Sequence, residues 1–136
     1  MPERFPRPLS EREGAVLDYL LAIDFPGRGA LAQQRRRVQV TERWGTEPTI
    51  EVDVQARDST DRAVVEMDNP VEANTRDGLF SVVLRVRDGL LQMIELVDNA
   101  GRGQRQELPA PEDLAEPIAL GLSAAKSWWT QPDGEK

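Results

Sequence analysis

The chain has 136 residues and a formal charge of −7, from 17 basic and 24 acidic side chains. It contains neither cysteine nor histidine, which excludes disulfides, thiolate nucleophiles, imidazole acid–base catalysis and structural zinc sites. The length fits one domain, and the negative charge disfavours binding to duplex nucleic acid, whose phosphates would repel it.

The beginning of the chain does not resemble a signal peptide, because charged and proline residues stand where an apolar stretch would be needed. No apolar run is long enough to span a membrane. We therefore expect a cytoplasmic protein without membrane association, metal or cofactor. Residues 1–9 hold three prolines and predict an extended arm.

A helix is predicted to begin after Ser10. Ser10 and Glu13 have the spacing of a capping box, in which each side chain accepts a hydrogen bond from the other residue's amide. Apolar residues then recur at helical spacing as far as the stop at Phe25-Pro26-Gly27; they are Val16, Leu17, Leu20, Leu21 and Ile23. A second helix is predicted over about residues 28–36.

From Val38 the apolar period changes to two, which predicts a hairpin with a five-residue turn at 45–49. In this register Trp44 faces Ile50, Val40 faces Val54, and one face of the hairpin is apolar. Glu42 is the charged residue that the pattern turns toward that face. A third strand is predicted at about residues 62–67, and the chain is expected to break at Pro70.

Arg-Asp-Gly-Leu occurs twice, at residues 76–79 and 87–90. If each Asp-Gly is a two-residue turn, the two turns independently place the same four apolar side chains on one face; these are Phe80, Val82, Leu84 and Val86. The agreement predicts a three-stranded meander. Its register places Glu95 opposite Val82, on the core side.

The last element predicted is a C-terminal helix, from four residues at helical spacing: Ile118, Leu122, Ala125 and Trp129. The predicted fold class is α+β, with an N-terminal helical pair packed on an antiparallel five- or six-stranded meander sheet and a C-terminal helix. The domain organisation is an extended arm at 1–9, a single domain at 10–129 and a flexible tail at 130–136.

Four carboxylates are weak candidates for catalysis. If Glu42 or Glu95 were buried without a partner, its pKa would rise into the range that is useful for acid–base catalysis. Glu51 and Asp53 stand two apart on one strand, a spacing that could hold a divalent cation or supply a catalytic pair. These four residues would need no catalytic role if they lay at a solvated strand end, paired with an arginine or faced solvent on the outer side of the sheet.

Two clusters are candidates for binding. Arg35, Arg36 and Arg37 could grip phosphate or an acidic partner, although cations at a helix C-terminus also stabilise the helix dipole. Trp128 and Trp129 cannot both face the core of one helix, so one of them is a candidate interface anchor.

Four segments together carry a resemblance: LSEREGAVLDYLLAIDFPG, VQVTERWGTEPTIEV, VVLRVRDGLLQMIELV and ELPAPEDL. Over residues 9–115 the chain resembles a family of small uncharacterised actinobacterial proteins. Members of that family often have cysteines near the first hairpin, where this chain has Trp44-Gly45-Thr46. The resemblance implies the architecture, and it implies no metal site and no activity.

The leading hypothesis is a non-enzymatic protein of regulatory or inhibitor and immunity type that binds another macromolecule, with an acidic surface that meets a basic partner. The alternative is an enzyme or small-ligand-binding domain that works with carboxylates and arginine alone. Nucleic-acid binding through Arg35–Arg37 ranks third. Homodimerisation is a further hypothesis, because an open sheet leaves edges and faces to cover.

Overall fold

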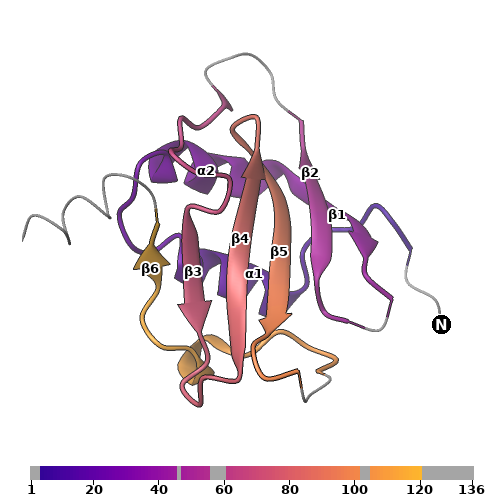
Figure 1. Ribbon diagram of the computed structural model, residues 1–136. Helices are drawn as coiled ribbons and strands as arrows, with labels where there is room; N and C mark the ends of the chain where they lie inside the picture. Colours follow the sequence, from indigo (N-terminus) through magenta and orange to yellow (C-terminus); the bar gives the residue numbers. More distant parts are fainter. Residues whose placement is uncertain (1–3, 46, 56–60, 102–104, 121–136) are drawn as a thin grey trace, which may run out of the picture.

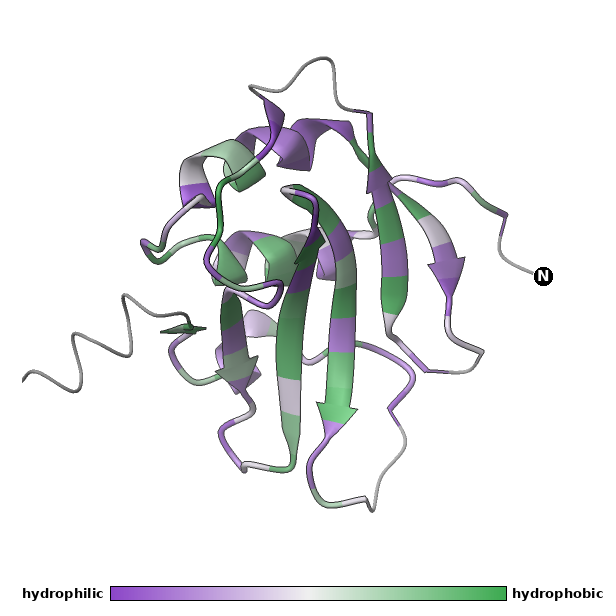
Figure 2. Cartoon of the chain, turned by 45° about the horizontal axis from the view of Figure 1, so that its top comes forward, coloured by the Kyte–Doolittle hydropathy of each residue, from purple (hydrophilic) through white to green (hydrophobic). Residues whose placement is uncertain are grey.

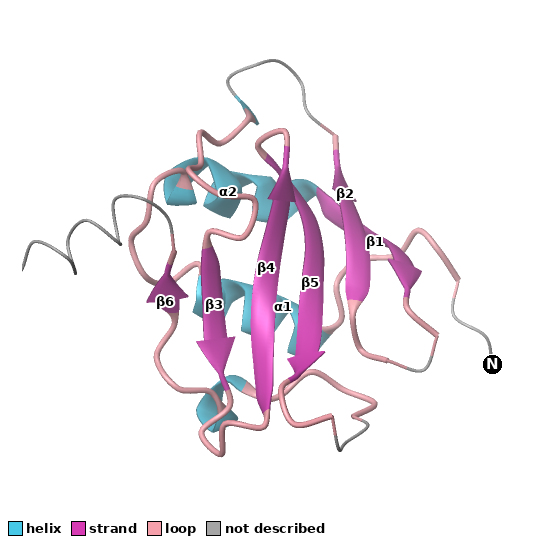
Figure 3. Ribbon diagram, viewed as in Figure 1, coloured by secondary structure: helices cyan, strands magenta, loops and turns pink. Residues whose placement is uncertain are grey.

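The structure is a computed structural model that describes residues 4–45, 47–55, 61–101 and 105–120. Two helices, α1 (Glu11–Leu20) and α2 (Arg28–Gln34), lie side by side on one face of a six-stranded sheet (Figures 1 and 3). The strands are β1 (Val38–Arg43), β2 (Ile50–Val54), β3 (Val71–Asn74), β4 (Phe80–Arg87), β5 (Leu90–Asp98) and β6 (Ile118–Ala119). Short 3-10 turns span Arg35–Arg37 and Pro111–Asp113.

The sheet is antiparallel throughout and has the strand order β1-β2-β5-β4-β3-β6. Its centre is the predicted meander of β3, β4 and β5. The hairpin of β1 and β2 joins one edge of the meander through β5, and β6 joins the other edge through β3. An α+β protein with an antiparallel sheet was therefore predicted correctly, but the sheet is not a simple meander.

The predicted C-terminal helix is wrong where the structure describes it. Ile118, its first predicted apolar residue, lies in β6 and pairs with Glu72 of β3. The amide of Leu120 then donates to the carbonyl of Pro70, 2.8 Å away. Pro117 cannot donate within a helix, and the open edge of β3 offers partners to an extended chain. The other three residues of the predicted helix lie outside the described residues.

The capping box starts α1 as predicted. The amide of Glu13 donates to Ser10 Oγ at 3.1 Å, and the amide of Ser10 donates to Glu13 Oε1 at 2.8 Å. The helix ends at Leu20, before the predicted stop, but Leu21 and Phe25 remain buried.

The two helices cover the core face of the sheet. Hydrophobic and hydrophilic residues alternate along β2 and β5 (Figure 2).

A β-bulge in β5 changes the predicted register. The turn at Asp88-Gly89 pairs Val86 with Leu91 as predicted, but the next residue, Arg85, pairs with Met93, so Gln92 is the extra residue. Beyond the bulge Val83 faces Glu95, on the side away from the helices. The prediction that Glu95 faces the core is wrong, because the bulge gives the core the apolar Ile94 and Leu96 in place of Met93 and a carboxylate.

A second irregularity moves Glu42. Val38 pairs with Val54 and Val40 with Val52, two residues from the predicted register, and the pairing then shifts so that Glu42 faces Glu51. The apolar side chains keep a common face. The bulge turns Glu42 to the opposite, exposed face. An unpaired carboxylate in the core would be costly, so this register is favoured.

The predicted strand at residues 62–67 is not formed; the structure describes this segment, and it is irregular. It is nevertheless tied to the sheet at two points. The amide of Ala63 donates to the carbonyl of Gly89 at 2.8 Å, and the amide of Val86 donates to the carbonyl of Asp68 at 2.6 Å. The segment closes one end of the core against the β4–β5 turn.

Gln34, at the end of α2, is completely buried and connects three parts of the chain. Its Nε2 donates to the carbonyls of Asp61 and Gly89, at 2.7 and 2.8 Å, and its Oε1 accepts from the amide of Leu91 at 2.9 Å. A buried amide side chain is costly unless its groups are bonded, and here both polar atoms have partners. The contact fixes α2 and the irregular segment on the β4–β5 turn.

The two Asp-Gly turns provide a matched test of this close packing. Gly78 and Gly89 both have φ of +79°, but a Cβ at Gly78 meets nothing within 4 Å, whereas one at Gly89 would lie 2.6 Å from the carbonyl oxygen of Ala63. We expect Gly78→Ala to cost about 1–2 kcal/mol, the strain of an L residue at positive φ. Gly89→Ala should cost clearly more in urea denaturation, and equal losses would contradict the packing described.

Substitution of Gln34 tests the polar connection. Gln34→Leu removes the acceptor of the Leu91 amide and a donor to the Asp61 carbonyl, whereas the Gly89 carbonyl keeps its bond from Ala63, so we expect a loss of at least about 2 kcal/mol in the free energy of unfolding. Gln33→Leu, at the exposed neighbouring position, should change it by no more than about 0.5 kcal/mol. Hydrogen exchange of the Leu91 amide should accelerate in the first variant only. An unchanged exchange rate would show that the side chain does not hold the turn.

Candidate functional site

The four candidate carboxylates share the face of the sheet that points away from the helices, called the outer face below. Glu42 and Glu51 are cross-strand neighbours, and Glu51 also neighbours Met93 of β5. Asp53 lies two residues further along β2, and Glu95 lies on β5. They therefore line one exposed surface and do not converge in the cavity described below.

Two of these carboxylates have close partners. Arg85 Nε donates to Glu95 Oε1 at 2.6 Å across β4 and β5. Trp44 Nε1 donates to Glu51 Oε2 at 2.9 Å. These contacts hold Glu95 and Glu51 against neighbouring side chains of the sheet, and Glu42 lies opposite Glu51. The arrangement therefore favours a surface role over a catalytic pair.

The outer face has an apolar centre with an acidic surround. Val83 and Met93 lie at its centre, and they are 5% and 8% exposed. Their cross-strand neighbours on this face include Glu72, Glu95 and Glu51. In Figure 1 the helices lie behind the sheet and no described helix or strand lies in front of it. In the part of the chain that the structure describes, the outer face is therefore covered by no helix and no further strand.

Trp44 lies where β1 ends and is 39% exposed. Its amide donates to the carbonyl of Thr49 at 3.0 Å, so the hairpin closes one residue tighter than predicted and does not pair Trp44 with Ile50. The indole instead reaches Glu51 on β2. Trp128 and Trp129, the predicted interface anchors, lie outside the described residues.

The three arginines of the basic cluster predicted at the end of α2 have different neighbours. Arg35 Nε donates to Asp18 at 3.0 Å, while Arg37 NH1 donates to Asp61 at 3.1 Å and to the carbonyl of Gln55 at 2.8 Å. Arg36 is exposed between them. Arg35 and Arg37 thus connect the 3-10 turn to neighbouring segments, while Arg36 and Arg37 line a second cavity of about 490 Å³ together with Gln33 and Asp61.

A different set of arginines surrounds a cavity of about 420 Å³ between the start of α1 and the end of β1. Arg7, Arg12 and Arg43 come from the arm, from α1 and from β1, and all three line it. The arm is held in place because Arg7 and Val40 exchange two backbone hydrogen bonds, of 3.0 and 2.7 Å. No local pattern connects these arginines, since only the tertiary structure brings them together.

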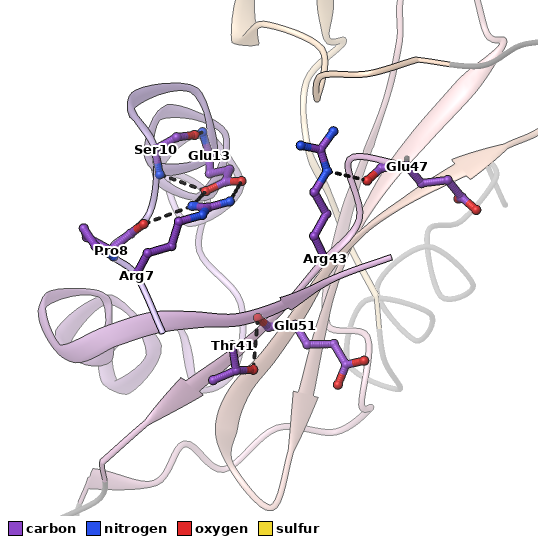
Figure 4. A network of polar contacts seen from close by, with 8 residues as sticks. All are labelled: Arg7, Pro8, Ser10, Glu13, Thr41, Arg43, Glu47 and Glu51. Atoms are coloured by element: carbon purple, nitrogen blue, oxygen red, sulfur yellow. Dashed lines mark hydrogen bonds and ion pairs between the residues drawn. The ribbon is translucent and has the colours of Figure 1, made fainter. Parts of the chain in front are cut away.

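Glu13 connects this cavity to the helix cap. Arg7 donates to both of its carboxylate oxygens, at 2.8 and 3.0 Å, and Ser10 donates to one of them (Figure 4). Burial raises the pKa of Glu13, but the hydrogen bonds from Arg7 and Ser10 and the charge of Arg7 outweigh burial and hold the pKa below its ordinary value. Glu13 is therefore a charged anchor for the arm.

Among the described residues, no group of three or more acidic side chains is arranged to hold a metal ion. None of the helices in the described part of the chain is long and apolar enough to cross a membrane.

Comparison with known proteins gives no relative: no family model matches the sequence, and neither a curated protein nor a solved structure is significantly similar to the chain. The resemblance to small actinobacterial proteins therefore stays a prediction.

The lowered pKa of Glu13 predicts how its contribution depends on pH. Since the folded pKa lies below the unfolded one, the stabilisation is present above the ordinary value of 4.5 and is lost as the pH falls through the folded pKa. Glu13→Gln should cost about 1–2 kcal/mol near neutral pH, and its difference from wild type should shrink in acid. Glu11→Gln, at an exposed position of the same turn, is the control. A difference for Glu13→Gln that stays constant into the acid range would contradict the prediction.

Proposed function

We propose that the protein is a non-enzymatic binding protein and that its outer face receives a basic, extended segment of another protein. The observation that carries the proposal is the acidic surround of an apolar centre on an open sheet face. Five carboxylates contribute to this face: Glu42, Glu51, Asp53, Glu72 and Glu95.

Charge complementarity supports a basic partner. The carboxylates lie on four strands of the sheet, and the cations on this face are Arg85, which is paired with Glu95, and the exposed Arg87 on the same strand. A surface with this balance attracts lysine and arginine and speeds their association. Two copies of the same face would bring carboxylates together, so the proposal favours a partner of opposite charge over a second copy of this chain.

Exposed apolar side chains at the edges of the face support a protein partner over a small cation. Val83 and Met93 are already almost fully buried, but Ile118, which pairs with Glu72, is 46% exposed and is the kind of apolar surface that a protein partner covers. An extended segment alternates its side chains with a period of two, so arginines and aliphatic residues can meet the acidic and the apolar parts of the face. Trp44, half-exposed beside Glu51, lies near this surface and adds an aromatic group of the kind enriched in interfaces.

The test uses the full chain and a synthetic peptide of alternating arginine and valine, followed by NMR of the backbone amides. We expect saturable binding with the largest shifts in β4 and β5. The triple variant Glu51→Gln, Asp53→Asn, Glu72→Gln should bind about tenfold or more weakly, because each lost charge pair removes a few tenths to one kcal/mol.

The control is a triple variant with the same loss of charge elsewhere, Glu11→Gln, Asp24→Asn, Glu112→Gln, at exposed positions outside the sheet. We expect it to bind the peptide as wild type does. If both triple variants lose affinity equally, attraction is a property of the net charge and the outer face is not a binding surface. Shifts confined to the helices would lead to the same conclusion.

A further inference from the structure

We infer that the cavity between α1 and β1 binds a small molecule through an oxyanion group, a phosphate or a carboxylate. The inference rests on the arginines that line this cavity, and it does not depend on the proposed function of the outer face. Figure 4 shows the separation: Arg43 points to the side of Arg7 and Glu13, whereas Thr41 and Glu51 lie on the other side of the hairpin.

Three guanidinium groups face the cavity on a chain whose net charge is −7. Two carboxylates accompany them: Glu13, held by Arg7, and Glu107, whose Oε1 is 3.7 Å from Arg12 NH1 and whose side chain is 72% exposed. Cations therefore outnumber anions here, in contrast to the outer face. The cavity also adjoins the start of α1, where the helix dipole is positive.

Backbone carbonyls fix the direction of two of the arginines. Arg12 NH1 donates to the carbonyl of Leu108 at 2.7 Å, and Arg43 NH2 donates to the carbonyl of Gln106 at 2.7 Å. Arg43 Nε also donates to the carbonyl of Glu47 at 2.8 Å. Contacts with backbone carbonyls orient the guanidinium groups, and a fixed planar donor group matches the oxygens of phosphate and carboxylate.

The rest of the wall is partly apolar and the size is suitable. Leu9, Pro48 and Leu108 line the cavity together with the polar Ser10 and Gln106, and Pro48 and Leu108 are buried. Apolar walls reduce the screening of the arginine charges by water. The volume of about 420 Å³ lies in the range of about 300–1,000 Å³ that is typical of small-molecule sites. The ligand class is therefore a metabolite-sized molecule with one anionic group and an apolar or neutral remainder.

The experiment titrates the full chain with inorganic phosphate and, separately, with citrate, at constant ionic strength and with chloride as the reference anion. Binding is followed by NMR of the backbone amides of residues 7–13 and 105–108. We expect saturable shifts with one or both probes, and the tighter probe identifies the phosphate or the carboxylate as the preferred group.

Three variants assign the site. Arg12→Gln and Arg43→Gln should each weaken binding by about tenfold or more, the value expected for one charge-assisted hydrogen bond. Arg12→Lys keeps the charge and should bind at an intermediate level. Arg76→Gln is the matched control, because Arg76 is an exposed arginine whose Nε also donates to a backbone carbonyl, that of Glu112 at 3.1 Å, away from the cavity. It should bind as wild type does.

Two results would overturn the inference. The first is a set of shifts that does not saturate or that chloride produces equally. The second is a loss of affinity in Arg76→Gln as large as in the variants of Arg12 and Arg43. A circular dichroism melt of each variant accompanies the titration. If Arg43→Gln fails to fold, the test uses Arg12→Gln and Arg12→Lys instead. If both of these variants bind the probe as tightly as wild type does, the cavity is not the binding site.

Discussion

The buried amide of Gln34 is the contact on which the arrangement of this fold depends. It accepts from Leu91 and donates to two carbonyls, and thereby holds the end of α2 on the β4–β5 turn and on the irregular segment before β3. Because an unsatisfied polar group in the core is costly, the three segments can separate only together. Gly89 approaches Ala63 closely at the same place, where the amide of Ala63 donates to the carbonyl of Gly89. With α2 fixed in this way beside α1 on one side of the sheet, no described helix covers the other side.

The chemical character of that open side results from two β-bulges. Bulges in β1 and β5 turn Glu42 and Glu95 away from the core, where the simple alternation of the sequence would have placed them. The core gains Ile94 and Leu96, and the outer face gains the carboxylates. The two bulges thus keep unpaired carboxylates out of the core and, at the same time, create the acidic surface proposed to bind a basic segment. The stability of the core and the proposed function have one structural cause.

The hairpin of β1 and β2 separates charges of opposite sign. Glu51 lies on the outer face with Trp44, while Arg43 points to the side of α1 (Figure 4). The bulge is again responsible, because it places Arg43 opposite the inward-facing Ile50. The two proposals therefore concern different faces and ligands of opposite charge. A variant that changes one face leaves the other face in place, so each proposal can fail without the other.

The sequence by itself determined the features that depend on neighbouring residues. The capping box of Ser10 and Glu13 started a helix where predicted, and the two Asp-Gly turns fixed the register beside them, because a tight turn requires positive φ at defined positions. Period-two alternation also identified the strands of the first hairpin and the meander. Only the tertiary structure decided the bulges, β6 and the arginine cavity. A bulge depends on the pairing of distant residues, and β6 depends on the open edge of β3. The cavity depends on an arm that bonds to Val40, so no spacing along the chain could reveal that Arg7 and Arg43 meet.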